Sequence, residues 1–146
     1  MWSYVIFRYQ PDLLRDDWAP LGVVVERSCD NGGAEIGVMC LSQAEVEGCS
    51  EIATAMLQGA DAVLRNEVES TRARMGGTED FLEALRAGSP WNFHFTPVAS
   101  CNLDTDDIRQ AAMILFYKHV ILSQQTALPP TIAIKPRRME GYELAV

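Results

Sequence analysis

The polar residues that follow the first apolar segment are the most specific candidates for a site in this chain. Residues 2–9 are rich in aromatic and β-branched side chains, and Arg8, Pro11, Asp12 and Arg15 lie at their end or follow shortly after. Because proline fixes φ and ends the strand, Arg8 and Asp12 can pair across the turn, and Arg15 can join them. These three side chains either fix how the strand leaves the sheet or form a polar site at its end.

Carboxylates offer a second kind of chemistry. Two groups are dense enough to hold a divalent cation: Asp12, Asp16 and Asp17, and Asp104, Asp106 and Asp107. Carboxylates at a strand end suit metal-dependent phosphoryl hydrolysis, although a solvated loop is the favoured explanation of the first group. The second group lacks the calcium-loop pattern, and acids at a helix N-terminus are stabilised by the helix dipole without any metal.

The two histidines do not predict a metal site, because they are far apart and have no fixed spacing. His94 lies among aromatic residues, where it could act as a general base or stack against a nucleobase. The alternation of residues 91–96 instead places it on the polar face of a half-buried strand. His119 falls in the apolar stripe of a helix, as expected for a core or interface histidine.

The cysteines favour a reduced, structural role. The sequence contains four cysteines, and none of them form a CxxC pair. They are Cys29, Cys40, Cys49 and Cys101. No charged start followed by an apolar run marks a secretory signal, so we expect reduced thiols in a cytoplasmic protein. No apolar stretch approaches the roughly 20 residues that span a bilayer, so no membrane association is expected.

Motifs for cofactors and covalent catalysis are missing from the sequence. There is no GxSxG elbow and no glycine-rich phosphate loop, so we expect no catalytic residue, cofactor or metal. Residues 135–138 form a small basic cluster, from Lys135 to Arg138, that is too short to predict nucleic-acid binding.

The elements that position these residues follow from hydrophobic periodicity. Residues 2–9, 21–29 and 34–41 are predicted strands, and Asn31-Gly32 favours a tight hairpin turn between the last two. The continuous run Val23-Val24-Val25 indicates a strand that is buried on both faces.

Periodicity then changes to that of a helix. Residues 42–45 fit a capping box, and an apolar stripe runs from Val46 to Leu64, so helical structure is predicted from about residue 45 to 75. Gly48 and Gly59 weaken this run, so it is either one bent helix or two. A short helix around residues 81–85, a strand over 91–96, a helix over 105–123 and an extended piece over 131–135 follow.

This order predicts an α+β fold with an antiparallel sheet of about four to five strands and helices packed on one face. We expect a single domain over residues 1–146, with residues 124–146 as a C-terminal extension. A chain of 146 residues is long enough to bury a real core.

Charge is distributed unevenly. The formal net charge is −8, and no Lys or Arg occurs between Arg27 and Arg65. Glu45, Glu47 and Glu51 are predicted to lie on the outer face of the first helix, as an acidic interaction face for a protein partner with a basic surface. Direct nucleic-acid binding is disfavoured, because it relies on an excess of Lys and Arg.

Part of the sequence resembles a known family. The segment 4–12, Arg15 and the segment 21–25 resemble the opening of DUF3037, a bacterial family of unknown function, with its R-Y-x-P-D pattern. Residues 91–98 and the helix after them resemble the end of that family. The chain departs from the family at Asp16, where glycine is common, and at Pro20, where asparagine often stands.

The resemblance implies a bacterial or phage-borne protein. It also implies a protein partner, because genes of the family are often found beside genes for kinase-like proteins of the toxin type. We therefore expect a small cytoplasmic protein-interaction module without its own catalysis, as an accessory partner of such a protein. Two alternatives stay open: a metal-dependent phosphoryl hydrolase or nuclease that uses the carboxylates near the first strand, and an acidic nucleic-acid mimic that inhibits a DNA-binding protein.

Overall fold

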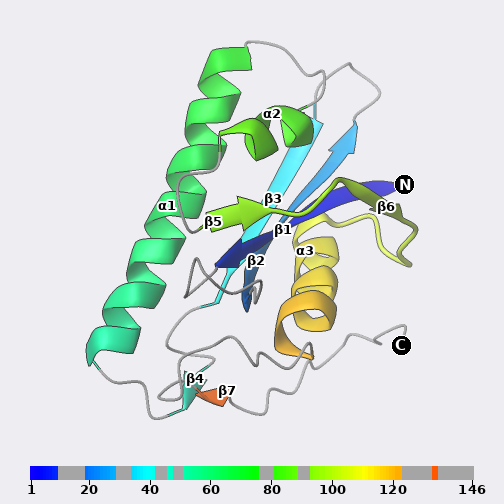
Figure 1. Cartoon of the computed structure of the whole chain (residues 1–146). Helices are drawn as coiled ribbons and strands as arrows, with labels where there is room; N and C mark the ends of the chain where they lie inside the picture. Colours follow the sequence, from blue (N-terminus) through cyan, green and yellow to red (C-terminus); the bar gives the residue numbers. More distant parts are fainter. Residues whose placement is uncertain are drawn as a thin grey trace.

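The computed structural model describes residues 1–9, 19–28, 34–41, 46–47, 51–75, 81–88, 93–122 and 133–134 (Figure 1). Its elements follow in chain order: β1 (Trp2–Tyr9), β2 (Ala19–Ser28), β3 (Ala34–Cys40), β4 (Val46–Glu47), α1 (Glu51–Met75), α2 (Phe81–Ala87), β5 (Phe93–Phe95), β6 (Ala99–Cys101), α3 (Ile108–Phe116), the π-helical turn η2 (Tyr117–Ile121) and β7 (Ala133–Ile134).

The main sheet has five strands in the order β3-β2-β1-β5, and β6 also pairs with β1. All of these pairings are antiparallel. The predicted α+β class and the antiparallel sheet of about five strands are therefore confirmed. The strands β4 and β7 form a separate two-stranded sheet.

The strands β5 and β6 are two halves of one interrupted edge strand. β5 pairs with the second half of β1 and β6 with the first half, and the register shifts by one residue between them. At the shift, the Ile6 N–H donates to the Thr96 hydroxyl oxygen (2.8 Å), and the Thr96 N–H donates to the Ile6 carbonyl (3.0 Å). The Thr96 hydroxyl thus takes the place of a backbone carbonyl as acceptor at the position where the edge strand holds one extra residue.

Helices cover both faces of the sheet, which differs from the expectation of one face. A Cβ added at Gly22 would lie 3.0 Å from a side-chain carbon of Leu64 in α1, and one at Gly37 would lie 3.0 Å from Ile108 in α3. Gly37 lies opposite Val25, three residues after Gly22 along β2, so the two glycines face opposite sides. The helices α1 and α3 therefore pack on opposite faces, as Figure 1 shows.

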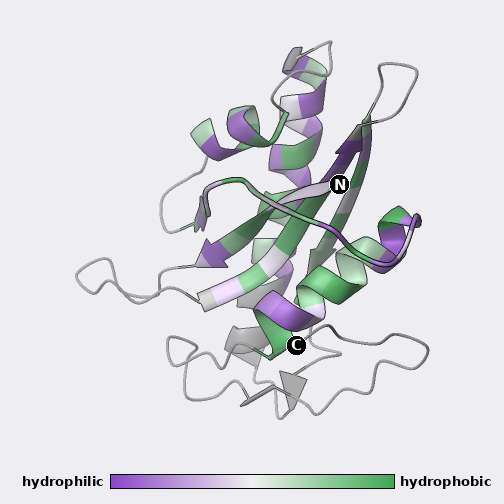
Figure 2. Cartoon of the chain, turned by 90° about the vertical axis from the view of Figure 1, so that its right-hand side faces the viewer, coloured by the Kyte–Doolittle hydropathy of each residue, from purple (hydrophilic) through white to green (hydrophobic). Residues whose placement is uncertain are grey.

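The core explains this arrangement. Val23, Val24 and Val25 are all fully buried, so β2 needs apolar cover above and below, as the continuous valine run predicts. Figure 2 shows hydrophobic residues concentrated in the central strands and in α3, whereas hydrophobic and hydrophilic residues alternate along α1 and α2. On the α1 face the ring of Phe7 stacks on Phe93 at 5.2 Å and tilts against Phe95, so these two aromatics share a face as predicted.

The first long helix begins later than its sequence pattern predicts. Val46–Glu47 is a strand that pairs with Ala133–Ile134, and α1 begins at Glu51. The predicted start near Glu45 is therefore wrong, and the capping box over 42–45 lies outside the described residues. Gly48 weakens a helix at this point, and the competing strand comes from a segment almost 90 residues away, which no local pattern reveals. The pairing also ties part of the predicted C-terminal extension to the β4 segment.

Gly22 is a position where an added Cβ would be crowded from two sides. It would lie 2.7 Å from the backbone carbonyl oxygen of Met39 in the neighbouring strand β3 and 3.0 Å from a side-chain carbon of Leu64 in α1. We expect Gly22→Ala to lower the free energy of unfolding by about 1–3 kcal/mol, because backbone has to shift to make room. Urea denaturation measures the change.

Gly59 provides the matched control, because it lies in α1 with open space around it. We expect Gly59→Ala to stabilise the chain by about 0.5–1 kcal/mol through helix propensity. Equal effects of the two substitutions would contradict the packing described for Gly22.

Candidate functional site

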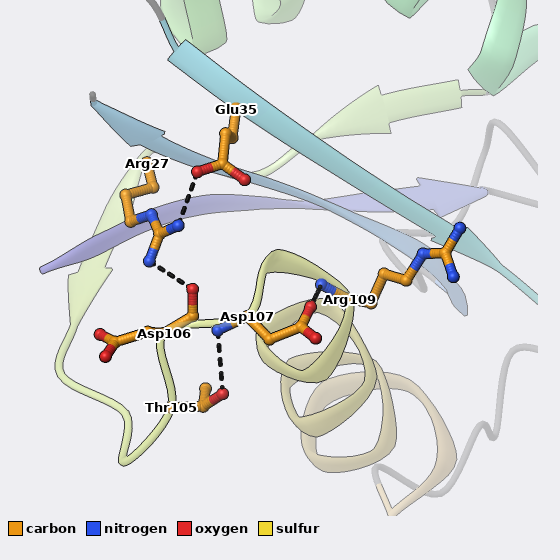
Figure 3. Close-up of polar contacts among 6 residues, drawn as sticks. All are labelled: Arg27, Glu35, Thr105, Asp106, Asp107 and Arg109. Carbon is orange, nitrogen blue, oxygen red and sulfur yellow. Dashed lines mark hydrogen bonds and ion pairs between the residues drawn. The ribbon is translucent and has the colours of Figure 1, made fainter. Parts of the chain in front are cut away.

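Arg27 fastens the sheet to the start of α3 (Figure 3). Its Nη2 lies 2.6 Å from Oε1 of Glu35, the residue opposite it in the β2–β3 register, and its Nη1 donates to the carbonyl of Asp106. The guanidinium also lies over the Trp2 ring, 4.7 Å from the centroid. One half-buried cation therefore contacts β1, β3 and the segment before α3, and each contact uses a different part of its planar group.

The N-terminus of α3 is capped by the residues that the sequence marks. Asp107 is the N-cap, and its Oδ1 accepts the N–H of Arg109 at 2.8 Å. The Thr105 hydroxyl accepts the N–H of Asp107 at 3.1 Å and donates to Gln110 at 2.7 Å. The Asp107 side chain thus has a structural role as a cap. In the described part of the chain no group of three His, Cys, Asp or Glu is placed to hold a metal ion.

An open hollow of about 600 Å³ lies beside this cap, on the α3 face of the sheet. Its lining is mainly acidic and polar: Glu35, Thr105, Asp106, Asp107, Ile108 and Gln110. Glu35 comes from β3 and has a side chain that is 40% exposed even while Arg27 contacts it. A cationic side chain fits this hollow better than an anionic one.

A second hollow, of about 540 Å³, lies on the opposite face between β3 and α1. Val38, Val68 and Ala73 supply its apolar lining, and Arg65, Glu69 and Arg72 supply charge. Arg65 forms an ion pair with Asp61, which lies one turn earlier in α1, and its Nε is 3.1 Å from the carboxylate. Apolar side chains of a bound molecule would therefore meet the apolar lining of this hollow, and its carboxylates would meet the arginines.

The strand β3 separates the two hollows and is the last of the described strands on its side of the sheet. The Leu41 N–H donates to the Leu21 carbonyl at 2.6 Å, and backbone groups of successive residues point to opposite sides. Met39 and Gly37 therefore direct their backbone groups to β2, whereas Val38 and Ile36 direct theirs outward. Among the described strands, none pairs with this outer edge.

The polar trio predicted at the end of the first strand is described only in part. Arg8 is half-buried near the end of β1 and lies opposite His94 of β5 in the strand register. Asp12 and Arg15 lie outside the described residues, as do Asp16 and Asp17. The pairing of Arg8 with these residues stays a prediction. The structure shows that His94, which is far from Arg8 in the sequence, is its neighbour across the strands.

The predicted acidic face is also described in part. Glu47 lies in β4, Glu51 is the first residue of α1, and Glu45 lies outside the described residues. The three glutamates therefore do not share one helix, although their role in binding stays a prediction. Two of the cysteines, Cys40 and Cys101, are not joined in a disulfide, and burial raises the pKa of the Cys101 thiol, which disfavours a reactive thiolate.

Both histidines are held toward their neutral forms. Burial lowers the pKa of His94, and the positive charges of Arg8 and Arg86 lower it further. Burial lowers the pKa of His119, with Lys118 as a smaller cause, and its ring lies 5.2 Å from that of Tyr4. This contact confirms that His119 faces the interior side of its helix.

The Arg27 contacts give a stability prediction. We expect Arg27→Lys to lower the free energy of unfolding by about 1–2 kcal/mol, because an ammonium cannot reach the Glu35 carboxylate and the Asp106 carbonyl as a fork. Arg109→Lys is the control, since its side chain is exposed and only its backbone N–H joins the cap. Chemical denaturation compares the two, and equal losses would contradict the role given to Arg27.

The histidines give a pH prediction. Their folded-state pKa values lie below 6.5, the value for the unfolded chain, so below about pH 7 the unfolded chain binds more protons. The free energy of unfolding is therefore highest above pH 6.5 and falls as the pH drops toward the folded-state values. We expect the double variant His94→Gln, His119→Gln to show a flatter profile between pH 7.5 and about 5.5 in denaturation experiments. A profile as steep as that of the original chain would contradict these pKa directions.

The described part of the chain contains no helix that is long and apolar enough to cross a membrane. Comparison with models of protein families, with curated proteins and with solved structures finds no match to this chain. The resemblance to DUF3037 therefore stays a prediction.

Proposed function

We propose that this chain is a small cytoplasmic protein-interaction module without its own catalysis, and that it binds its partner along the outer edge of β3. The observation that carries the proposal is the position of that strand. It is the last described strand on its side, it directs the backbone groups of Ile36 and Val38 outward, and it has a hollow on each face. A strand edge with these features is a common template for an added strand.

Charge supports a partner that brings basic side chains. The hollow on the α3 face is lined by three carboxylates, those of Glu35, Asp106 and Asp107. The chain as a whole carries a net charge of −8, which favours encounter with a basic surface. A kinase-like protein of the toxin type is the partner that the DUF3037 resemblance implies.

The proposal is tested by blocking the edge without disturbing the sheet. Proline at position 38 removes an N–H that points away from β2, so Val38→Pro should cost no hydrogen bond of the sheet. Val38→Thr is the matched control, because it keeps the N–H and the β-branched shape. Thermal unfolding of both variants verifies that they fold.

The measurement is a pull-down from the cells that produce this protein. We expect the tagged original chain and the tagged Val38→Thr variant to retain the same partner, and the tagged Val38→Pro variant to lose it. Mass spectrometry identifies the retained protein. Retention by all three baits would contradict a role for the edge. Loss only on replacing Glu45, Glu47 and Glu51 by Lys would place the interface on the predicted acidic face instead.

A further inference from the structure

The two hollows beside β3 differ in chemistry, and this difference selects the side chains of an added strand. Side chains of an extended strand alternate between the two faces of the sheet. Residues of an added strand would therefore meet the α1 hollow and the α3 hollow in turn. This inference rests on the proposed function and names the class of segment that the edge of β3 accepts.

The α1 hollow favours apolar and acidic side chains. Val38 and Val68 provide an apolar surface, Val68 being 6% exposed, and the charged residues of the lining are Arg65, Arg72 and Glu69, which leave a net positive charge. These arginines are seven residues apart in α1, about 10 Å along the helix axis. Two carboxylates on one face of a strand, four residues apart, are separated by about 13 Å. Flexible arginine side chains span the difference.

The α3 hollow favours the opposite charge. Glu35 stands on β3 itself, with its side chain on this face, so a residue directly across from it in an added strand becomes its cross-strand neighbour. Asp106 and Asp107 are exposed at the same hollow. A lysine or arginine meets complementary charge here, whereas a glutamate meets repulsion.

We infer that β3 binds an extended protein segment in which acidic and apolar residues alternate with basic ones. The acidic and apolar side chains lie against Arg65, Arg72 and Val38, and the basic side chains lie against Glu35, Asp106 and Asp107. A second copy of this chain fits less well, since its own β3 carries Ala34, Ile36 and Val38 in alternation with only one charged residue, Glu35.

Two synthetic peptides of equal composition test the pattern. In Lys-Glu-Lys-Val-Lys-Glu-Lys the acidic and apolar residues share one face of a strand, whereas in Lys-Lys-Glu-Val-Glu-Lys-Lys each face is mixed. We expect the alternating peptide to bind at least about fivefold more tightly, as measured by fluorescence anisotropy of labelled peptides at low salt. Equal binding of the two peptides would overturn the inference.

Variants of the chain locate the interaction. The double variant Arg65→Gln, Arg72→Gln should reduce the preference for the alternating peptide over the mixed one to less than about twofold, because the glutamates of the peptide lose their partners. Arg74→Gln is the control, since Arg74 is exposed on the same helix but does not line the hollow. Val38→Pro should abolish binding of the alternating peptide. Binding that survives Val38→Pro, or a preference that survives the double variant, would overturn the inference.

The experiment also separates this inference from the proposed function. If Val38→Pro loses the natural partner while the two peptides bind equally, the edge is the interface but the alternating pattern is wrong. If sedimentation shows a dimer of the original chain that Val38→Pro converts to a monomer, a second copy occupies the edge, and the inference is overturned. A monomeric original chain with a preference for the alternating peptide supports it.

Discussion

The close approach of helices to both faces of β2 and β3 is the constraint on which the rest of the structure depends. Gly22 admits α1 and Gly37 admits α3, and neither position has room for a larger side chain without movement of its neighbours. With both faces covered, the valines of β2 are fully buried, although the sheet is antiparallel. Because α1 and α3 flank β3, the outer strand has a hollow on each side instead of a flat, solvated face.

Arg27 extends this constraint to the segment before α3. Its contacts to Glu35, to the Asp106 carbonyl and to the Trp2 ring hold the start of α3 against the end of the β2–β3 pair. The acidic lining of the α3 hollow is therefore held by charge-assisted hydrogen bonds of a half-buried guanidinium and by a helix cap.

Much of the fold could be predicted from local patterns, because those patterns report burial. The aromatic first strand, the valine run of β2 and the alternation of residues 93–95 each gave the right element. The start of α1 and the strand β6 could not be predicted, since each depends on pairing with a distant segment: Val46–Glu47 with Ala133–Ile134, and Ala99–Cys101 with Trp2–Tyr4. The valine run also pointed to cover on both faces, and it was a better guide than the order of the elements.

The candidate site was harder to predict than the fold. Arg8 was singled out because its sequence neighbours are distinctive, and the aspartates before α3 because they are dense. The hollows beside β3 combine residues from positions 35–38, 65–73 and 105–110. Arg65 and Arg72 looked like ordinary residues of a solvated helix, and only the packing of α1 on β3 brings them beside Val38.

The interrupted edge strand has a consequence for assembly. A sheet with two regular edges can stack copies end to end without limit, since each added copy presents a fresh edge for the next. In this molecule the edge opposite β3 is broken by the bulge at Thr96 and carries Pro97, which has no N–H to offer. Only β3 is left as a regular edge among the described strands of the main sheet, so repeated edge-to-edge addition of copies is disfavoured.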